Sequence, residues 1–356
     1  MFEKVISLFL TLFVIISCNK QNKEFKFSKL GLSIPPEINI SGDSISLDGI
    51  VMPGKMSLKD SILFILDEDF DKNIHIVDIK NEKYLSSIAD IGKGPGETLS
   101  AVSIDFFDNQ IWLHDITLSK LVSYNLDSII TDKKTNYSYS EEIVFKDKAR
   151  QNFNPLWLND STLISTTFSE SENRLVYTNK LGNIFKEKFK MVNPERKNTP
   201  RSVHNASYQS TSKIHPNKEK IAIVNRYSDL LEIHNLKTDE SLYFKTHLDF
   251  VPIYEVVNTD GGVTMAQDDT TRFGCIDISV TKDKIFTLYS GRTRGEGLAN
   301  YANKIYVYDW EGRYLTSYRI PNLAIAILAK DNETLFTSEY NRKGEGMIKK
   351  YHLNEE

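Results

Sequence analysis

The feature that most constrains the fold of this chain is a hairpin pattern that recurs six times. Each copy has an apolar strand, a polar turn and a second strand that ends beside Asp or Asn, as in Ile62–Leu66 with Ile74–Ile79. Alternation with a period of two predicts half-buried β-strands, and six copies predict six similar sheets. Equivalent positions in the six copies are 48 to 64 residues apart: Leu63, Ile111, Leu163, Ile221, Ile285 and Leu335.

Six small sheets of this kind favour a ring. A small twisted sheet has two faces to bury, and a closed radial arrangement covers both faces of every sheet. We therefore predict an all-β protein whose residues 25–356 form one six-bladed β-propeller of four-stranded antiparallel blades. The strand before each hairpin, such as Val102–Phe106, is expected to be the inner strand of its blade. The segment around Phe25–Ile40 is expected to add a strand to the last blade and close the ring. A two-domain β-sandwich is the alternative.

The first residues predict export. Lys4 is followed by the apolar run Val5–Ile16, which is short for a membrane span and typical of a signal peptide. The run ends at Ser17-Cys18, which resembles a lipobox. We therefore expect residues 1–17 to be a lipoprotein signal peptide, Cys18 to be acylated and residues 18–24 to form a tether. An ordinary secretory signal with an incidental cysteine is the alternative.

These predictions place the protein in the cell envelope, attached to a lipid bilayer through the acylated Cys18. No acidic run follows Cys18, which favours the outer membrane on its periplasmic side. The net charge of −4 provides no basic excess for a nucleic acid partner. Cys275 is the only other cysteine, so we expect no disulfide within the mature domain. Its apolar setting in Phe273–Ile276 favours a buried, inert thiol over a nucleophile.

Three motifs resemble those of a known family. Ile91–Glu97 reads IGKGPGE directly after the first hairpin, and the later stretches are Phe286–Arg292 and Tyr306–Gly312. They are similar to motifs of the TolB-like six-bladed propeller lipoproteins of Gram-negative bacteria, and the resemblance covers nearly the whole mature chain. It implies the propeller fold and the envelope location, but no biochemical activity.

Three glycine-rich charged loops are candidates for a ligand or partner surface. In a propeller, the link between blades and the loop between the second and third strands lie on one face. Gly92–Glu97 is such a link, and Ser290–Lys304 and Glu339–Gly346 are such loops. Their glycines permit positive φ and expose backbone N–H groups. The candidate residues of this rim are Lys93, Glu97, Arg292, Arg294, Glu296, Arg342, Lys343 and Glu345. Such a rim suits sugar hydroxyls or carboxylates; turn chemistry with locally paired charges is the alternative.

Metal and catalytic patterns are weak. Asp67–Asn73 has acidic residues at alternate positions, as in a calcium loop. However, Lys72 stands where that loop needs Gly, and Asp78 stands where it needs Glu. A solvated acidic hairpin is therefore expected, and His204 and His215 are not expected to bind metal. No cofactor is predicted, although a divalent metal held in the central channel by residues of several blades stays open.

The remaining histidines and the tryptophans are expected to be structural. His75, His114 and His234 fall in or beside repeat strands, and packing between blades is the expected role of Trp112, Trp157 and Trp310.

These observations favour a function without chemistry of its own. The chain has no HExxH, no GxSxG and no phosphate-loop motif. We therefore predict a non-enzymatic binding or scaffolding propeller for a protein or glycan partner. A metal-dependent hydrolase or lyase with its site in the central channel is the alternative.

Overall fold

The computed structural model describes residues 27–29, 37–45, 50, 52–67, 72–131, 137–192, 199–246, 248–259 and 262–353. The predicted signal peptide, Cys18 and the tether lie outside these residues. None of the helices in the described residues has the length and apolarity that a membrane crossing requires.

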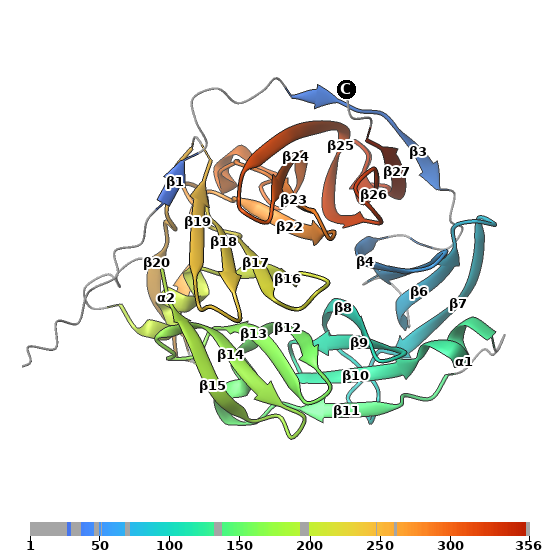
Figure 1. Ribbon diagram of the computed structural model, residues 1–356, viewed down its shortest axis with the longest axis horizontal. Helices are drawn as coiled ribbons and strands as arrows, with labels where there is room; N and C mark the ends of the chain where they lie inside the picture. Colours follow the sequence, from blue (N-terminus) through green and yellow to red (C-terminus); the bar gives the residue numbers. More distant parts are fainter. Residues whose placement is uncertain are drawn as a thin grey trace, which may run out of the picture.

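Six antiparallel blades surround a central axis, each with its first strand innermost (Figure 1). Blade 1 contains β4 (Pro53–Lys59), β5 (Ile62–Asp67), β6 (Lys72–Asp78) and β7 (Lys83–Asp90). Blade 2 contains β8 (Ala101–Phe107), β9 (Gln110–Asp115), β10 (Lys120–Asn125) and β11 (Glu141–Val144). Blade 3 contains β12 (Asn152–Asn159), β13 (Thr162–Thr167), β14 (Asn173–Asn179) and β15 (Ile184–Lys190). Blade 4 contains β16 (Ser210–Ile214), β17 (Lys220–Asn225), β18 (Leu231–Asn235) and β19 (Ser241–Lys245).

Blades 5 and 6 share one long strand. Blade 5 contains β22 (Cys275–Val280), β23 (Lys284–Tyr289), β24 (Ala302–Asp309) and the first half of β25 (Tyr314–Ala329). The second half of β25 is the inner strand of blade 6, which continues with β26 (Thr334–Tyr340) and β27 (Gly346–His352). The inner strands contact one another in the order β4, β8, β12, β16, β22 and β25, and β25 contacts β4. The predicted six-bladed ring is therefore confirmed, with each of the six equivalent residues in the second strand of its blade.

The predicted closing segment is wrong in its position. The strand that completes blade 6 is β3 (Gly42–Ile45), antiparallel to β27. The preceding strands lie on the outer edges of earlier blades: β1 (Phe27–Lys29) is parallel to β19, and β2 (Ile38–Asn39) is parallel to β25. The three described N-terminal strands thus lie on blades 4, 5 and 6 in turn (Figure 1). These strands are two to four residues long, too short for a pattern of apolar residues to identify the one that pairs with β27.

Apolar side chains fill the spaces between neighbouring blades. All six residues of β5 are buried. Between blades 2 and 3, the Trp157 ring stacks on Phe107 at 4.9 Å and lies 5.0 Å from Trp112. The indole of Trp310 is also buried, and its Nε1 donates to the Thr281 carbonyl at 3.1 Å. The predicted packing role of the three tryptophans is confirmed.

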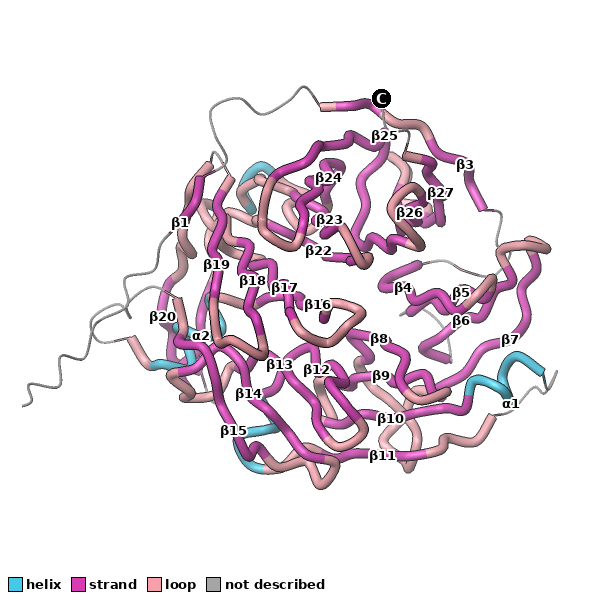
Figure 2. The backbone as a smooth tube through the Cα atoms, viewed as in Figure 1, coloured by secondary structure: helices cyan, strands magenta, loops and turns pink. Residues whose placement is uncertain are grey.

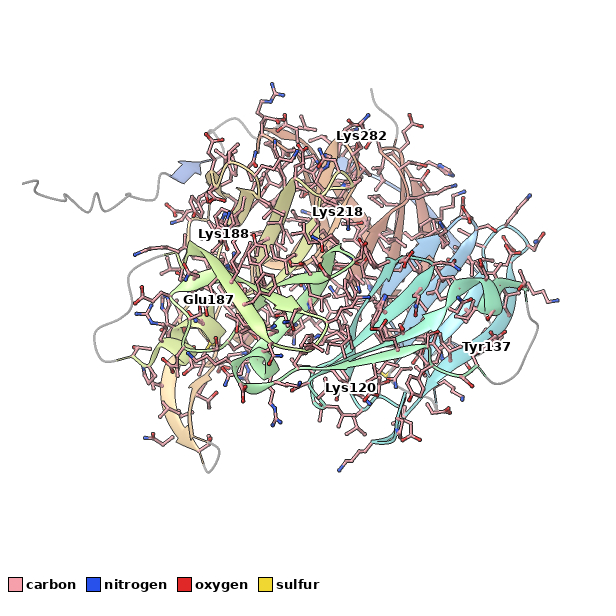
Figure 3. All side chains as sticks on the ribbon, turned by 60° about the horizontal axis from the view of Figure 1, so that its bottom comes forward. Lys120, Tyr137, Glu187, Lys188, Lys218 and Lys282 are labelled. Atoms are coloured by element: carbon pink, nitrogen blue, oxygen red, sulfur yellow. The ribbon has the colours of Figure 1, made fainter. Side chains whose placement is uncertain are left out.

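Helices occur only in connecting segments of the described chain (Figure 2). They are α1 (Leu126–Thr131), α2 (Arg201–Ser207) and the short 3₁₀ turns η1 (Asp147–Gln151) and η2 (Arg294–Glu296). The link between blades 4 and 5 carries a further hairpin, β20 (Glu255–Thr259) with β21 (Gly262–Ala266). Figure 3 shows this hairpin, in pale orange, projecting from the ring on the side away from Lys218 and Lys282. We call this side, which holds the links between blades, the hairpin face.

Candidate functional site

The three predicted rim loops all lie on the hairpin face. The loop of Arg292, Arg294 and Glu296 joins β23 to β24 in blade 5, and the loop of Arg342, Lys343 and Glu345 joins β26 to β27 in blade 6. Lys93 and Glu97 lie in the link from β7 to β8, further around the ring beyond blade 6. The structure therefore brings the blade 5 and blade 6 loops into neighbouring blades and leaves the third loop apart from them.

The three rim carboxylates bond within their own loops. Glu97 Oε2 accepts from the Gly94 N–H at 2.6 Å, and Glu296 Oε2 accepts from the Thr293 N–H at 2.6 Å. The Glu345 side chain accepts from the Asn341 amide at 2.6 Å. The bond from the Thr293 N–H lowers the pKa of Glu296, which keeps this carboxylate ionised and in place. For these three acids, the structure agrees with the alternative interpretation, in which each carboxylate bonds within its own turn.

The cationic side chains of the rim make fewer hydrogen bonds than the acidic ones. In the described residues, no hydrogen bond or ion pair engages the side chains of Lys93, Arg292, Arg342 and Lys343. Arg294 donates one bond, to the Gln267 carbonyl at 3.1 Å. Because the acids are held within their loops, the rim offers mainly cationic donors to a ligand rather than the mixed charge that the sequence suggests.

An open groove of about 590 Å³ lies beside the blade 5 loop on the hairpin face. One side comes from the end of β21 and the chain after it, and the other comes from the segment between η2 and β24. Its lining residues are Met265, Gln267, Phe273, Arg294, Leu298, Ala299, Asn300 and Tyr301.

Backbone hydrogen bonds fix the two sides of the groove to each other. The Gly295 N–H donates to the Asp269 carbonyl at 2.9 Å, and the Arg294 N–H donates to the Thr271 carbonyl at 2.9 Å. A Cβ on Gly295 would lie 3.0 Å from Asp269, so this close approach favours glycine. The groove is therefore a built feature of the loops.

Polar side chains bridge the base of the groove. Arg226, from the loop between β17 and β18, donates to Asn300 Oδ1 at 2.7 Å, and its guanidinium lies 5.8 Å from the centre of the Phe273 ring. The Gln267 amide donates to the Tyr227 hydroxyl at 2.7 Å. Blade 4 thus supplies an arginine that contacts two residues of the groove lining, Asn300 and Phe273.

Of the groove lining, only Arg294 belongs to the predicted rim. One signal in the sequence marks the missed residues: the longest interval between repeats, 64 residues, separates Ile221 from Ile285. This interval contains the inserted hairpin, and Asp260-Gly261-Gly262 within it has the composition of a tight turn.

Cys275 does not have the surroundings of a nucleophile. Burial raises the pKa of its thiol well above the ordinary range, and the nearby Asp229 carboxylate raises it further. The void beside it measures about 10 Å³, at the lower limit for a single water. The residue is partly rather than fully buried, and its raised pKa favours the predicted inert thiol over a nucleophile.

The core histidines are buried as predicted. The His114 ring packs edge-on against Phe145 at 6.0 Å, and burial lowers its pKa to about 4. His75 bonds to the Tyr84 hydroxyl at 3.0 Å, and His234 bonds to Ser241 at 2.7 Å. Each ring belongs to the packing of its blade.

The candidate metal residues do not converge. His204 lies in α2 on the hairpin face, whereas His215 lies on the opposite face and bonds to the Lys282 carbonyl at 2.9 Å. Residues 68–71 of the acidic stretch lie outside the described residues, and Asp78 accepts from the Lys80 and Asn81 N–H groups in a turn. Within the described residues there is no group of three or more His, Cys, Asp or Glu that would hold a metal ion.

The central channel carries an ion pair that connects blades. Lys55 of β4 pairs with Asp277 of β22, and the other Asp277 oxygen accepts from the Ile327 N–H at 3.0 Å. One carboxylate thereby joins blades 1, 5 and 6. Burial lowers the pKa of Lys55, and the Asp277 carboxylate opposes that shift. Both oxygens of Asp277 are used, which suits a structural role.

Comparison with known proteins gives a family and a fold. The model of the family described as TolB-like 6-blade propeller-like matches residues 37–331. A protein of Bacteroides fragilis classed as exported has 13% sequence identity and a TM-score of 0.58, with 92% of this chain and 100% of that chain covered. A DUF4221 family member from Bacteroides vulgatus has 9% identity and a TM-score of 0.55, with 90% of this chain and 96% of that chain covered. No curated protein matches the chain.

Proposed function

Because this chain belongs to the TolB-like 6-blade propeller-like family, we propose that it is a non-enzymatic binding or scaffolding module of the cell envelope. In this proposal, the acylated Cys18 attaches the chain to the periplasmic side of the outer membrane, and the hairpin face holds a partner. The export pattern of residues 1–18 supports the location, as does the structural similarity to a protein classed as exported.

One observation supports the binding role. The groove, the rim cations whose side chains make few or no hydrogen bonds, and the projecting hairpin all lie on the hairpin face. Propellers present variable loops on a rigid frame, and binding residues concentrate in such loops. Here the longest insertion, the open groove and the two rim arginines without a side-chain hydrogen bond in the described residues, Arg292 and Arg342, belong to adjacent loops of blades 4 to 6.

Site-specific photo-cross-linking in the cell that encodes the protein tests the proposed face. A benzophenone side chain replaces Leu298 beside the groove or, as the matched control, Lys282 on the opposite face. We expect a covalent adduct from position 298 and none from position 282. Adducts from position 282 alone would overturn the assignment of the face.

The membrane attachment has a separate test. With Cys18→Ser, we expect the chain to leave the membrane fraction and to lose labelling by an alkyne fatty acid, while the propeller stays folded. A variant that remains lipid-labelled and membrane-bound would contradict acylation at Cys18. A stoichiometric divalent metal in the purified protein would argue against a purely binding role.

A further inference from the structure

The projecting hairpin extends the groove outward with an apolar surface. Cross-strand partners in an antiparallel pair point to the same side, so Val256 and Met265 share one face of the hairpin. Val263, two residues from Met265 and opposite Asn258, lies on that same face. Because Met265 also lines the groove, the valine surface is continuous with it.

This apolar surface is open to solvent. The exposed fractions are 43% for Val256 and 43% for Val263, and the opposite wall presents Leu298 at 59%. Leu298 is held at a φ of 53°, in the left-handed region that a branched side chain adopts rarely. Clustered apolar side chains at the rim of a groove are typical of surfaces that another chain covers.

The hairpin also has an open backbone edge. Among the described strands, β20 pairs only with β21, and β21 lies against α2. The outer edge of β20 therefore presents N–H and C=O groups to an added strand, which is a common way to bind an extended peptide.

The charge around the base of the groove is complementary to a carboxylate. Arg294 lines the groove and Arg226 reaches Asn300 within it. Of the three nearby acids, Glu296 and Asp268 accept backbone N–H groups of their own turns, and Asp269 is exposed to solvent. The two arginines retain further donors, since each spends only part of its guanidinium on the contacts described.

The same features disfavour a sugar ligand. Sugars stack on open aromatic faces. Of the two aromatic residues that line the groove, Phe273 is 3% exposed and lies beneath Arg226, and the half-buried Tyr301 ring packs edge-on against Tyr340 at 5.6 Å. The three tryptophans are buried. Apolar walls and a free strand edge match a polypeptide better than a glycan.

We propose that the groove and the Val256–Met265 face bind an extended polypeptide segment of a partner protein, with alternate apolar side chains and an acidic residue. This inference rests on the proposed binding function and specifies its ligand class. The apolar side chains would lie against the valines and Leu298, and the carboxylate would lie at Arg294 and Arg226.

A random dodecapeptide library displayed on phage tests this ligand class on the mature chain in detergent. We expect the selected peptides to combine acidic residues with alternating apolar residues. Their Kd should rise about tenfold with Arg294→Gln, and by a similar factor with the double change Val256→Ser and Val263→Ser. Higher salt should weaken the binding, since the carboxylate contact is near the surface.

Matched controls separate the possible outcomes. Lys282→Gln removes a cation from the opposite face and should leave Kd unchanged, and circular dichroism checks that every variant is folded. A selection that enriches no peptide, or peptides that bind the groove variants as tightly as the wild type, would overturn the inference. If position 298 still cross-links a partner in cells, the proposed binding function survives that failure. Tight binding of oligogalacturonate, blocked by Arg294→Gln, would assign the groove to a glycan instead.

Discussion

At the scale of single residues, the polar side chains of the rim mainly stabilise the loops that carry them. Glu97 shows this clearly: a Cβ on Gly92 would lie 2.0 Å from its carboxylate, so the loop is folded tightly around that side chain. Tyr124 donates to the Gly96 carbonyl at 2.9 Å and ties the same loop to blade 2. The IGKGPGE motif therefore encodes the tight link between blades 1 and 2. Its one cation, Lys93, is exposed to solvent.

The buried His114 predicts a pH dependence of stability. Its pKa is about 4 in the folded protein, below the ordinary value near 6.5, because burial disfavours the charged ring. As the pH falls from 6.5 to 4, the unfolded chain takes up this proton before the folded chain does. The contribution of His114 to stability is therefore complete above pH 6.5. As the pH falls from 6.5 to 4, the free energy of unfolding decreases by on the order of 3 kcal/mol.

Denaturant unfolding at several pH values measures this effect. The His114→Leu variant should lose less stability than the wild type between pH 6.5 and 4. The exposed His352 provides the matched control, and His352→Gln should keep the wild-type slope. Equal slopes for His114→Leu and the wild type would show that the pKa of His114 is the same in the folded and the unfolded chain, which would contradict its lowering by burial.

At the scale of elements, the N-terminal strands differ in what they close. β3 completes blade 6, with Ile45 opposite Ile348 and against the apolar cluster between blades 6 and 1. β1 adds a parallel strand outside a blade that already has four. Only β3 is needed to give every blade four strands.

Two truncations test this difference. A chain beginning at Ile50 lacks β3 and should melt roughly 5–10 °C lower, because β27 loses its ladder and Ile45 no longer covers the core. A chain beginning at Glu37 lacks, of the described strands, only β1 and should melt close to the wild type. Scanning calorimetry of both chains measures the shift, and equal melting temperatures would mean that β3 contributes nothing to ring closure.

At the scale of the whole molecule, buried polar contacts hold neighbouring blades in register. Arg174 of blade 3 pairs with Glu232 of blade 4 at 2.9 Å, with both side chains buried, and also donates to Asn225 at 2.9 Å. Burial opposes ionisation of Glu232, but Arg174 and His234 outweigh it and hold the pKa at about 2. Lys55 and Asp277 connect blades 1 and 5 in a comparable way at the channel.

Removing one partner of the Arg174–Glu232 pair should be strongly destabilising. Arg174→Met leaves the buried Glu232 carboxylate without its arginine partner and should lower the free energy of unfolding by about 3–5 kcal/mol. The exposed pair of Lys237 and Glu219 provides the control, and Lys237→Met should change the stability little. Urea unfolding of both variants measures the difference, and a similarly small effect of the two changes would contradict a role for Arg174 in blade packing.

The sequence by itself determined the number of blades, the position of every second strand and the burial of the tryptophans. It did so because alternation of apolar residues is a local property, and six copies of one hairpin leave few ways to bury their faces. It also placed the three rim loops on one face, since strand order alone assigns each connection to a side of the ring.

Only the tertiary structure decided which of these loops line a groove. The groove joins Met265 to Leu298 across segments whose approach depends on the backbone bonds at Gly295. The tertiary structure also decides that Glu97, Glu296 and Glu345 bond within their own loops. It likewise decides that β3 is the strand that closes the ring. These outcomes depend on contacts between distant parts of the chain, and the strand pattern does not encode the distances between them.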